Sequence, residues 1–239
     1  MDKCCEIYKI SVAFKGELVY NNHKMGKVDV QMADNPAISG MVDALRPFLH
    51  PREKVFLCSF ENSRCAAFCA AAEAVRQLEA ECVCWSGQKN WQSLLRQIFL
   101  QRATVLIGTP RLILGLAKIA RMTGTPLPVR HVVLLGAADA PWLIRGIRDS
   151  LDVQIHYLPS DVQIPCAAVQ QDPQRQALEA QLLSWSSVLD FRAERTAQGL
   201  RMEILVFPGR KLPQLPSGAC ITVRDWNPKL DVPFCLCDS

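Results

Sequence analysis

Three polar residues in the middle of the chain, Tyr157, Ser160 and Asp161, combine side chains that could bind a phosphorylated ligand and a metal ion. A serine hydroxyl can contact a phosphate, and a carboxylate is the kind of hard oxygen ligand that Mg²⁺ prefers. The same residues also fit a plainer structure, in which a strand ends in a Pro159-Ser160-Asp161 turn and Tyr157 is half-buried in the core. The residue types alone leave a ligand site and a structural turn as open alternatives.

Cysteines offer a second kind of chemistry. The chain has eleven, and Cys82-x-Cys84 and Cys235-x-Cys237 could supply the four thiolates of a zinc or iron–sulfur site. Their spacing is shorter than that of most structural zinc sites, and the first pair falls in an apolar run where cysteine packs as a small hydrophobe. Packing is therefore the favoured interpretation. An odd number of cysteines without a secretion signal indicates a reducing compartment.

The elements that must position these residues alternate along the chain. Short apolar runs predict buried strands, and apolar residues at intervals of three and four predict helices. Expected strands cover 54–59, 81–85, 104–107, 131–135 and 153–157, and expected helices cover 36–49, 62–78, 91–100, 110–121 and 140–150. Pro36 is expected to open the first helix, and Pro47 to kink it or end it early. This alternation predicts an α/β fold with a mostly parallel sheet and helices on both faces.

The two flanks differ from this pattern. Before it, residues 6–14 and 17–20 predict a hairpin. After it, a helix is expected over 174–189, and strands over 202–207 and 219–223 predict a smaller C-terminal β lobe. We expect an α/β core lobe with the N-terminal hairpin over residues 1–165 and a smaller α+β lobe over 166–239.

Three consecutive segments read TVLIGTPRLILGLAKIA at 104–120, VRHVVLLGAADAPWLIRGIRDSL at 129–151 and DVQIHYLPSD at 152–161. In this order they resemble the Gly-Thr-Pro segment, the Gly-Gly-Glu turn and the Tyr-Gly-x-Thr-Glu motif of AMP-dependent, adenylate-forming acyl-CoA ligases, in particular phenylacetate-CoA ligases. Fainter similarity extends from Asn21 to the C-terminus. The resemblance implies the fold of the N-terminal domain of adenylate-forming ligases.

The resemblance also implies a nucleotide site that takes ATP or AMP with Mg²⁺. Tyr157 would pack on the adenine, Ser160 would contact the α-phosphate and Asp161 would hold the Mg²⁺ ion. Gly136 would leave space beside the nucleotide, and Lys27 would stand where the family has the lysine of its phosphate loop. The alternatives are an ordinary strand-to-helix turn at Gly136 and a solvated surface position for Lys27.

The chain departs from the family where the chemistry is done. The family wraps the ATP phosphates in a loop rich in glycine and threonine, whereas the corresponding segment here has only Gly26. Leu158 replaces the motif glycine, and Pro159 restricts the backbone beside it. We also expect the family's C-terminal domain, which brings a catalytic lysine to the phosphorus, to be absent. These departures predict a degenerate ligase-like pseudoenzyme, with no catalytic residues and no adenylation activity of its own.

Two other functions stay open. The chain could be an active ligase subunit that another chain completes with the missing lysine. It could also be a generic α/β binding module, because GTPRLI at 108–113 is similar to a Thr-Pro-Gly-Arg segment of DEAD-box helicases. The chain lacks, however, the G-x-x-x-x-G-K-[ST] loop and the Asp-Glu-Ala-Asp box of those proteins.

Charge and hydropathy limit the kinds of partner that the chain is expected to bind. The chain has 27 basic and 23 acidic residues. It contains no run of five like charges, which would have indicated a tail that binds nucleic acid or a patch that binds a membrane. Its apolar runs are shorter than the ~20 residues of a bilayer span, and its first residues lack the apolar stretch of a signal peptide. We expect a cytoplasmic protein that pairs with a protein partner or ligase subunit, and with neither nucleic acid nor membrane.

Overall fold

A computed structural model describes seven stretches of the chain, residues 36–58, 66–85, 90–135, 141–157, 173–197, 199–214 and 219–231. The predicted hairpin over 6–20 lies outside these residues. Among the helices of the described stretches, none combines the length and the apolar character needed to cross a bilayer.

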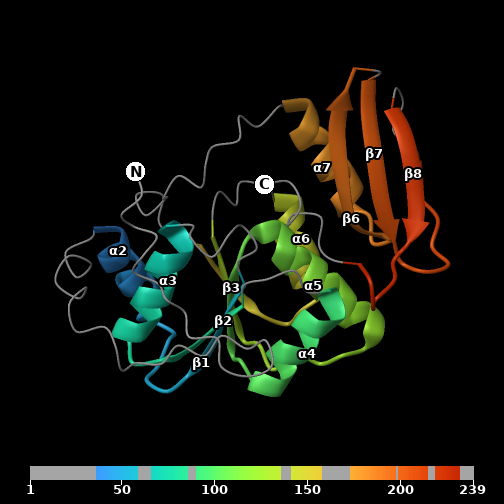
Figure 1. Ribbon diagram of the computed structural model, residues 1–239. Helices are drawn as coiled ribbons and strands as arrows, with labels where there is room; N and C mark the ends of the chain where they lie inside the picture. The colour runs from blue at the N-terminus through green and yellow to red at the C-terminus, as the bar shows by residue number, and fades with distance from the viewer. Residues whose placement is uncertain are drawn as a thin grey trace.

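Five parallel strands form the larger sheet, in the order β2-β1-β3-β4-β5 (Figure 1). They are β1 (Lys54–Cys58), β2 (Glu81–Trp85), β3 (Val105–Gly108), β4 (His131–Leu134) and β5 (Gln154–Tyr157). The three central strands are buried along nearly all of their length, as strands covered on both faces must be. The predicted α/β fold with a mostly parallel sheet is confirmed.

Helices cover both faces of this sheet (Figure 1). On one face lie α2 (Pro36–Leu45) and α3 (Ala66–Gln77), and on the other lie α4 (Trp91–Gln101), α5 (Pro110–Thr123) and α6 (Pro141–Arg148). Alternate residues of β1 serve the two faces, because Leu57 joins the core beneath α2 and α3 whereas Phe56 joins the core beneath α4 and α5. With both faces covered, the ends of the strands are the places where loops can build a site.

Local sequence decides where these helices begin and end. Helix α2 begins at Pro36, as predicted, and ends at Leu45, because Pro47 has no N–H with which to extend it. Of the two effects predicted for Pro47, the early end is the one that occurs. Helix α5 has Pro110 in its first turn and ends where Gly124 adopts a left-handed conformation with φ 64°. The N-cap of α4 is Asn90, whose side chain accepts a hydrogen bond from the Ser93 N–H at 2.8 Å.

A smaller mixed sheet follows, in the order β6-β7-β8. Its elements are α7 (Pro173–Ser184), β6 (Val188–Thr196), β7 (Gly199–Val206) and β8 (Ala219–Asp225). Strands β6 and β7 are antiparallel, and β7 and β8 are parallel. The strands predicted at 202–207 and 219–223 are confirmed. The helix predicted to reach 189 is wrong in its last turn, because the chain leaves the helix at Ser184 and pairs with β7 from Val188 onward.

The two sheets share one hydrophobic core. Inward residues of the smaller sheet, such as Phe191 and Ile204, belong to the same buried cluster as Leu106 of β3 and Leu112 of α5. Trp226, which follows β8, joins this cluster and meets Phe207 edge-on, with ring centroids 5.8 Å apart. Helices α4, α5 and α6 therefore lie against the large sheet on one side, and α5 and α6 also contact the smaller lobe.

Candidate functional site

The carboxyl ends of four strands meet at one edge of the large sheet. In the strand register, Cys58 is paired with Gly108, Gly108 with Leu134, and Leu134 with Tyr157. The chain passes from β1 to β2 on one side and from β3 to β4 on the other, so the connections diverge between β1 and β3. In open α/β sheets this divergence opens a crevice at the carboxyl edge, which is where such folds bind ligands.

Gly108 lets the backbones of β1 and β3 approach closely at this crevice. A Cβ at this position would lie 3.1 Å from the Cys58 carbonyl oxygen and 3.1 Å from Ile113 Cδ1, tighter than ordinary contact. The next residue, Thr109, is the N-cap of α5, and its side chain makes no capping hydrogen bond. The Gly-Thr-Pro turn therefore places the first turn of α5 directly at the edge, with backbone N–H groups that have no partner within the helix.

Tyr157 is the predicted site residue that the structure describes. It is the last residue of β5, the outermost strand on that side, and its side chain is 44% exposed. It is therefore a surface residue at the carboxyl edge and not a half-buried core residue. Its ring is accessible to a ligand at this edge.

The other predicted site residues, Lys27, Gly136, Ser160 and Asp161, lie outside the described residues, so their roles stay predictions. Leu135 directly precedes Gly136, and its N–H donates a hydrogen bond to the Gly108 carbonyl at 2.9 Å. This bond ties the exit from β4 to the exit from β3 at the crevice.

Arg111, in the first turn of α5, is a charged residue at this edge that sequence reasoning did not single out. Its Nη2 and Nε donate to Asp190 Oδ1 of β6 at 2.8 and 3.1 Å, and both side chains are largely buried. The guanidinium also donates to the Phe191 carbonyl and lies 4.9 Å from the centroid of the Phe191 ring. The pair attaches the smaller sheet to α5. A carboxylate inside the apolar run Val-Leu-Asp-Phe was the signal in the sequence, because a buried acid needs a cationic partner.

Lys118 makes a second attachment farther along α5. Its buried ammonium group donates to the carbonyls of Leu183 at 2.6 Å, Trp185 at 3.0 Å and Val188 at 2.7 Å. Burial lowers the pKa of Lys118 to about 8, and the negative charge of Asp190 opposes that shift. The three carbonyls come from the end of α7 and the start of β6, so this lysine joins the smaller lobe to α5 and serves no visible catalytic role.

His156 has a packing role in the large sheet. Its ring stacks on Phe48 with centroids 3.7 Å apart, and its Nε2 lies 3.1 Å from Nδ1 of His131 on the neighbouring strand. Burial, together with the charge of His131, lowers the pKa of His156. The pair covers the sheet beside α2, on the face opposite α5.

For the cysteines, packing stays the favoured prediction and a metal site stays the alternative. Cys82 is half-buried in β2, and Cys235 and Cys237 lie outside the described residues. Within the described stretches, no group of three or more His, Cys, Asp or Glu side chains is placed to hold a metal ion.

Comparison with known proteins gives similarity at the level of fold. No family model matches the chain. Among curated proteins there is no match either. Solved structures that do match include 2-hydroxyisobutyryl-CoA ligase in complex with 2-HIB-AMP and CoA, at 12% identity and a TM-score of 0.44 over 51% of this chain and 30% of that one.

Two further matches are of the same kind. The N-terminal domain of FACL13 from Mycobacterium tuberculosis matches at 11% identity and a TM-score of 0.43, over 52% of this chain and 32% of that one. Amide bond synthetase McbA from Marinactinospora thermotolerans matches at 14% identity and a TM-score of 0.42, over 74% and 57%. The chain spans about 30% of the first ligase. These likenesses concern the arrangement of strands and helices, and they assign neither a substrate nor a reaction.

Proposed function

We propose that this chain is a ligase-like protein that binds an adenine nucleotide, ATP or AMP, at the carboxyl edge of its large sheet. The observation that carries the proposal is the divergence of the chain between β1 and β3, with Gly108 closely packed on Cys58 at that crevice. Tyr157 ends β5 at the same edge, and its exposed ring offers a surface on which adenine can stack.

The residues that follow Tyr157 complete the proposed site. Ser160 would contact the α-phosphate, and Asp161 would hold a Mg²⁺ ion through its carboxylate. Gly136 follows β4 and would leave space beside the nucleotide, and Lys27 would add a positive charge near the phosphates. Phosphate groups are also well placed at the first turn of α5, where backbone N–H groups face the edge.

We further propose that the chain does not catalyse adenylation alone. Leu158 occupies the place of the motif glycine, and the segment around Gly26 has no run of glycine and threonine with which to wrap phosphates. Charge that develops on the transferring phosphorus must be stabilised by positioned donors. The Arg111 guanidinium in the first turn of α5 is held by Asp190 and the Phe191 carbonyl, so it does not supply that stabilisation.

The finer features of the proposal follow the sequence resemblance. The chain would be related to phenylacetate-CoA ligases among the adenylate-forming enzymes, it would work in the cytoplasm, and a protein partner or ligase subunit would act with it. These features guide the choice of acids and partners in the experiments.

Calorimetric titration with ATP and AMP, with and without Mg²⁺, tests the binding. We expect saturable binding, and Tyr157→Ala should weaken it about 5- to 150-fold, because base–aromatic stacking contributes roughly 1–3 kcal/mol. Phe99→Ala is the matched control, since Phe99 is a similarly exposed aromatic residue (49%) on α4. Absence of binding by the unaltered chain, or equal loss in both variants, would contradict the nucleotide site.

ATP–pyrophosphate exchange with a panel of carboxylic acids, including phenylacetate, tests the absence of adenylation. We expect no exchange above the background without protein. Robust exchange by the purified chain would overturn this part of the proposal and leave the nucleotide site intact.

A further inference from the structure

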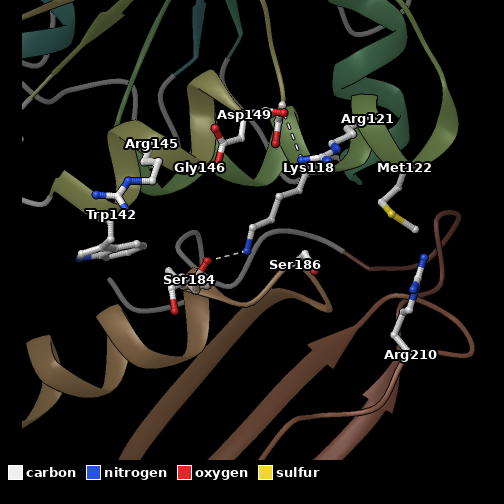
Figure 2. Close-up of a pocket in the computed structure, with 12 residues that line it drawn as sticks. Lys118, Arg121, Met122, Trp142, Arg145, Gly146, Asp149, Ser184, Ser186 and Arg210 are labelled. Carbon is white, nitrogen blue, oxygen red and sulfur yellow. Dashed lines mark hydrogen bonds between the residues drawn. The ribbon is translucent and has the colours of Figure 1, made fainter.

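A cavity of about 410 Å³ lies between α5, α6 and the C-terminal end of α7 (Figure 2). Its wall from α5 includes Lys118 and Met122, in the second half of a helix whose first turn is at the carboxyl edge. Eight residues of helix separate Pro110 from Lys118, which corresponds to about 12 Å. The cavity is thus a different place from the proposed nucleotide site, and its volume suits a small molecule.

Positive charge dominates the lining of this cavity. Lys118, Arg121, Arg145 and Arg210 contribute to it, and Asp149 is the carboxylate among the lining residues. Lys118 gives its three N–H groups to carbonyls, and Arg121 donates to the Asp149 carbonyl at 3.1 Å. Neither Arg145 nor Arg210 has a side-chain hydrogen bond or an ion pair with another residue in the described part of the chain. Their guanidinium groups therefore remain available to a ligand.

The two available arginines lie at opposite ends of the cavity. Figure 2 shows Arg145 beside the Trp142 ring at one end and Arg210 facing Met122 at the other, and between them Lys118 extends from α5 down to the end of α7. A guanidinium presents paired N–H donors that match the oxygens of a phosphate. The side chains of Trp142 and Met122 give each charged end an apolar neighbour.

We propose that this cavity binds a small molecule that carries a phosphate group at each end, one held by Arg145 and the other by Arg210. The two arginines carry positive charge that no carboxylate among the described residues neutralises, so they attract anions. Because they lie at opposite ends of the cavity, they favour a ligand with two anionic groups. Lys118 lies along the middle of the ligand and adds its charge without breaking its own hydrogen bonds. The site needs no adenine ring and no metal, so it is independent of the proposed nucleotide site.

Calorimetry with three probes on the full chain tests the proposal. We expect fructose 1,6-bisphosphate to bind at least tenfold more tightly than glucose 6-phosphate, and inorganic phosphate to bind more weakly still. Binding should weaken as sodium chloride is raised, because salt screens exposed charges. Arg145→Gln and Arg210→Gln should each lower the affinity for fructose 1,6-bisphosphate to about the affinity for glucose 6-phosphate, which has a single phosphate.

Arg148→Gln is the matched control, because Arg148 is an exposed arginine on the same helix that does not line the cavity. This variant should leave bisphosphate binding unchanged, and so should Tyr157→Ala, which separates this site from the carboxyl edge. The altered arginines are exposed, so all variants should fold, and circular dichroism checks this. No binding of the bisphosphate at millimolar concentration, or equal loss in Arg145→Gln and Arg148→Gln, would overturn the proposal.

Discussion

The smaller sheet carries charged side chains on both of its sides, and the two sets differ in their surroundings. On the inner side, Asp190 receives Arg111 in a largely buried ion pair, and Lys118 is enclosed by three carbonyls. On the outer side, Glu203 pairs with Arg192 at 2.8 Å and with Arg224 at 2.6 Å, and the two arginine side chains are 48% and 39% exposed. Arg224 also pairs with Asp231, whose carboxylate is buried. The distances are similar on the two sides, but the exposure to solvent is not.

This difference in exposure decides how much each set of charges contributes to the stability of the fold. Two charges taken out of water stabilise a structure only if they stay paired, so losing one partner is costly. Exposed pairs are screened by solvent and typically contribute less than about 1 kcal/mol. The inner charges therefore fix how the smaller sheet is attached to α5, whereas the outer charges mainly keep that surface soluble. Variants that remove one charge at a time test this comparison.

The largest effect should come from Asp190→Ala. It leaves the Arg111 guanidinium buried without a carboxylate, and we expect the free energy of unfolding to fall by about 3–5 kcal/mol. Urea denaturation followed by circular dichroism measures it. Adding Arg111→Met to the same chain should restore part of the loss, since no unpaired charge then remains. A loss below about 1 kcal/mol in the single variant would place this pair with the outer ones.

Lys118→Met should have the next largest effect. Three carbonyls lose their donor in a buried place, which we expect to lower the free energy of unfolding by about 1–3 kcal/mol at pH 7. The same denaturation experiment applies, with Lys229→Met as a control because Lys229 is an exposed lysine in the turn after β8. If both variants behaved alike, the carbonyl contacts of Lys118 would contribute nothing measurable.

The pH dependence of stability should also report on Lys118. Its folded-state pKa of about 8 lies below the ordinary value of 10.5, so between these values the unfolded chain binds more protons than the folded chain. The free energy of unfolding should therefore rise with pH in this window. Between pH 8 and 9.5 we expect the unaltered chain to gain roughly 1–2 kcal/mol relative to Lys118→Met. A difference between the two chains that stays constant over this range would show that Lys118 does not titrate there.

The smallest effect should come from Glu203→Gln on the outer side. Burial alone would raise the pKa of Glu203, but the hydrogen bond from Arg224 and the charges of Arg192 and Arg224 outweigh it and lower the pKa. The stabilisation is therefore present at neutral pH and lost as the pH falls through the lowered folded-state pKa. We expect a loss of less than about 1 kcal/mol at pH 7, which should shrink further in 0.5 M sodium chloride. A larger, salt-independent loss would contradict the contrast between the two sides.

The elements of the large sheet could be predicted because each depends on its own sequence. Short apolar runs mark its strands, Pro36 and Pro110 mark helix starts, and Pro47 marks an early helix end. Strand β6 was not predicted, because Asp190 and the charged residues after it interrupt its apolar pattern. It is a strand because β7 pairs with it and Arg111, 79 residues away, neutralises Asp190.

For the candidate sites too, features that depend on residues far apart in the chain could not be predicted from the sequence. The motif around Tyr157 could be found in the sequence because its residues are contiguous, and Tyr157 lies at the end of β5 with its side chain exposed. The cavity beside α5 could not be found, because Arg145 and Arg210 are far apart in the chain and line the same cavity only through packing. Gly115 has a comparable hidden role, since a methyl group there would overlap the Trp91 ring of α4.

Helix α5 carries both inner attachments, and this has a consequence for how the molecule unfolds. Arg111 and Lys118 are seven residues apart, about two turns, so they project from the same side of the helix toward β6. Separating the smaller sheet from α5 would leave buried charged groups without their partners at two points, and it would expose the shared core to water. Detachment should therefore cost nearly as much as complete unfolding. We expect heat to melt the two sheets together, in one calorimetric transition whose van't Hoff and calorimetric enthalpies agree.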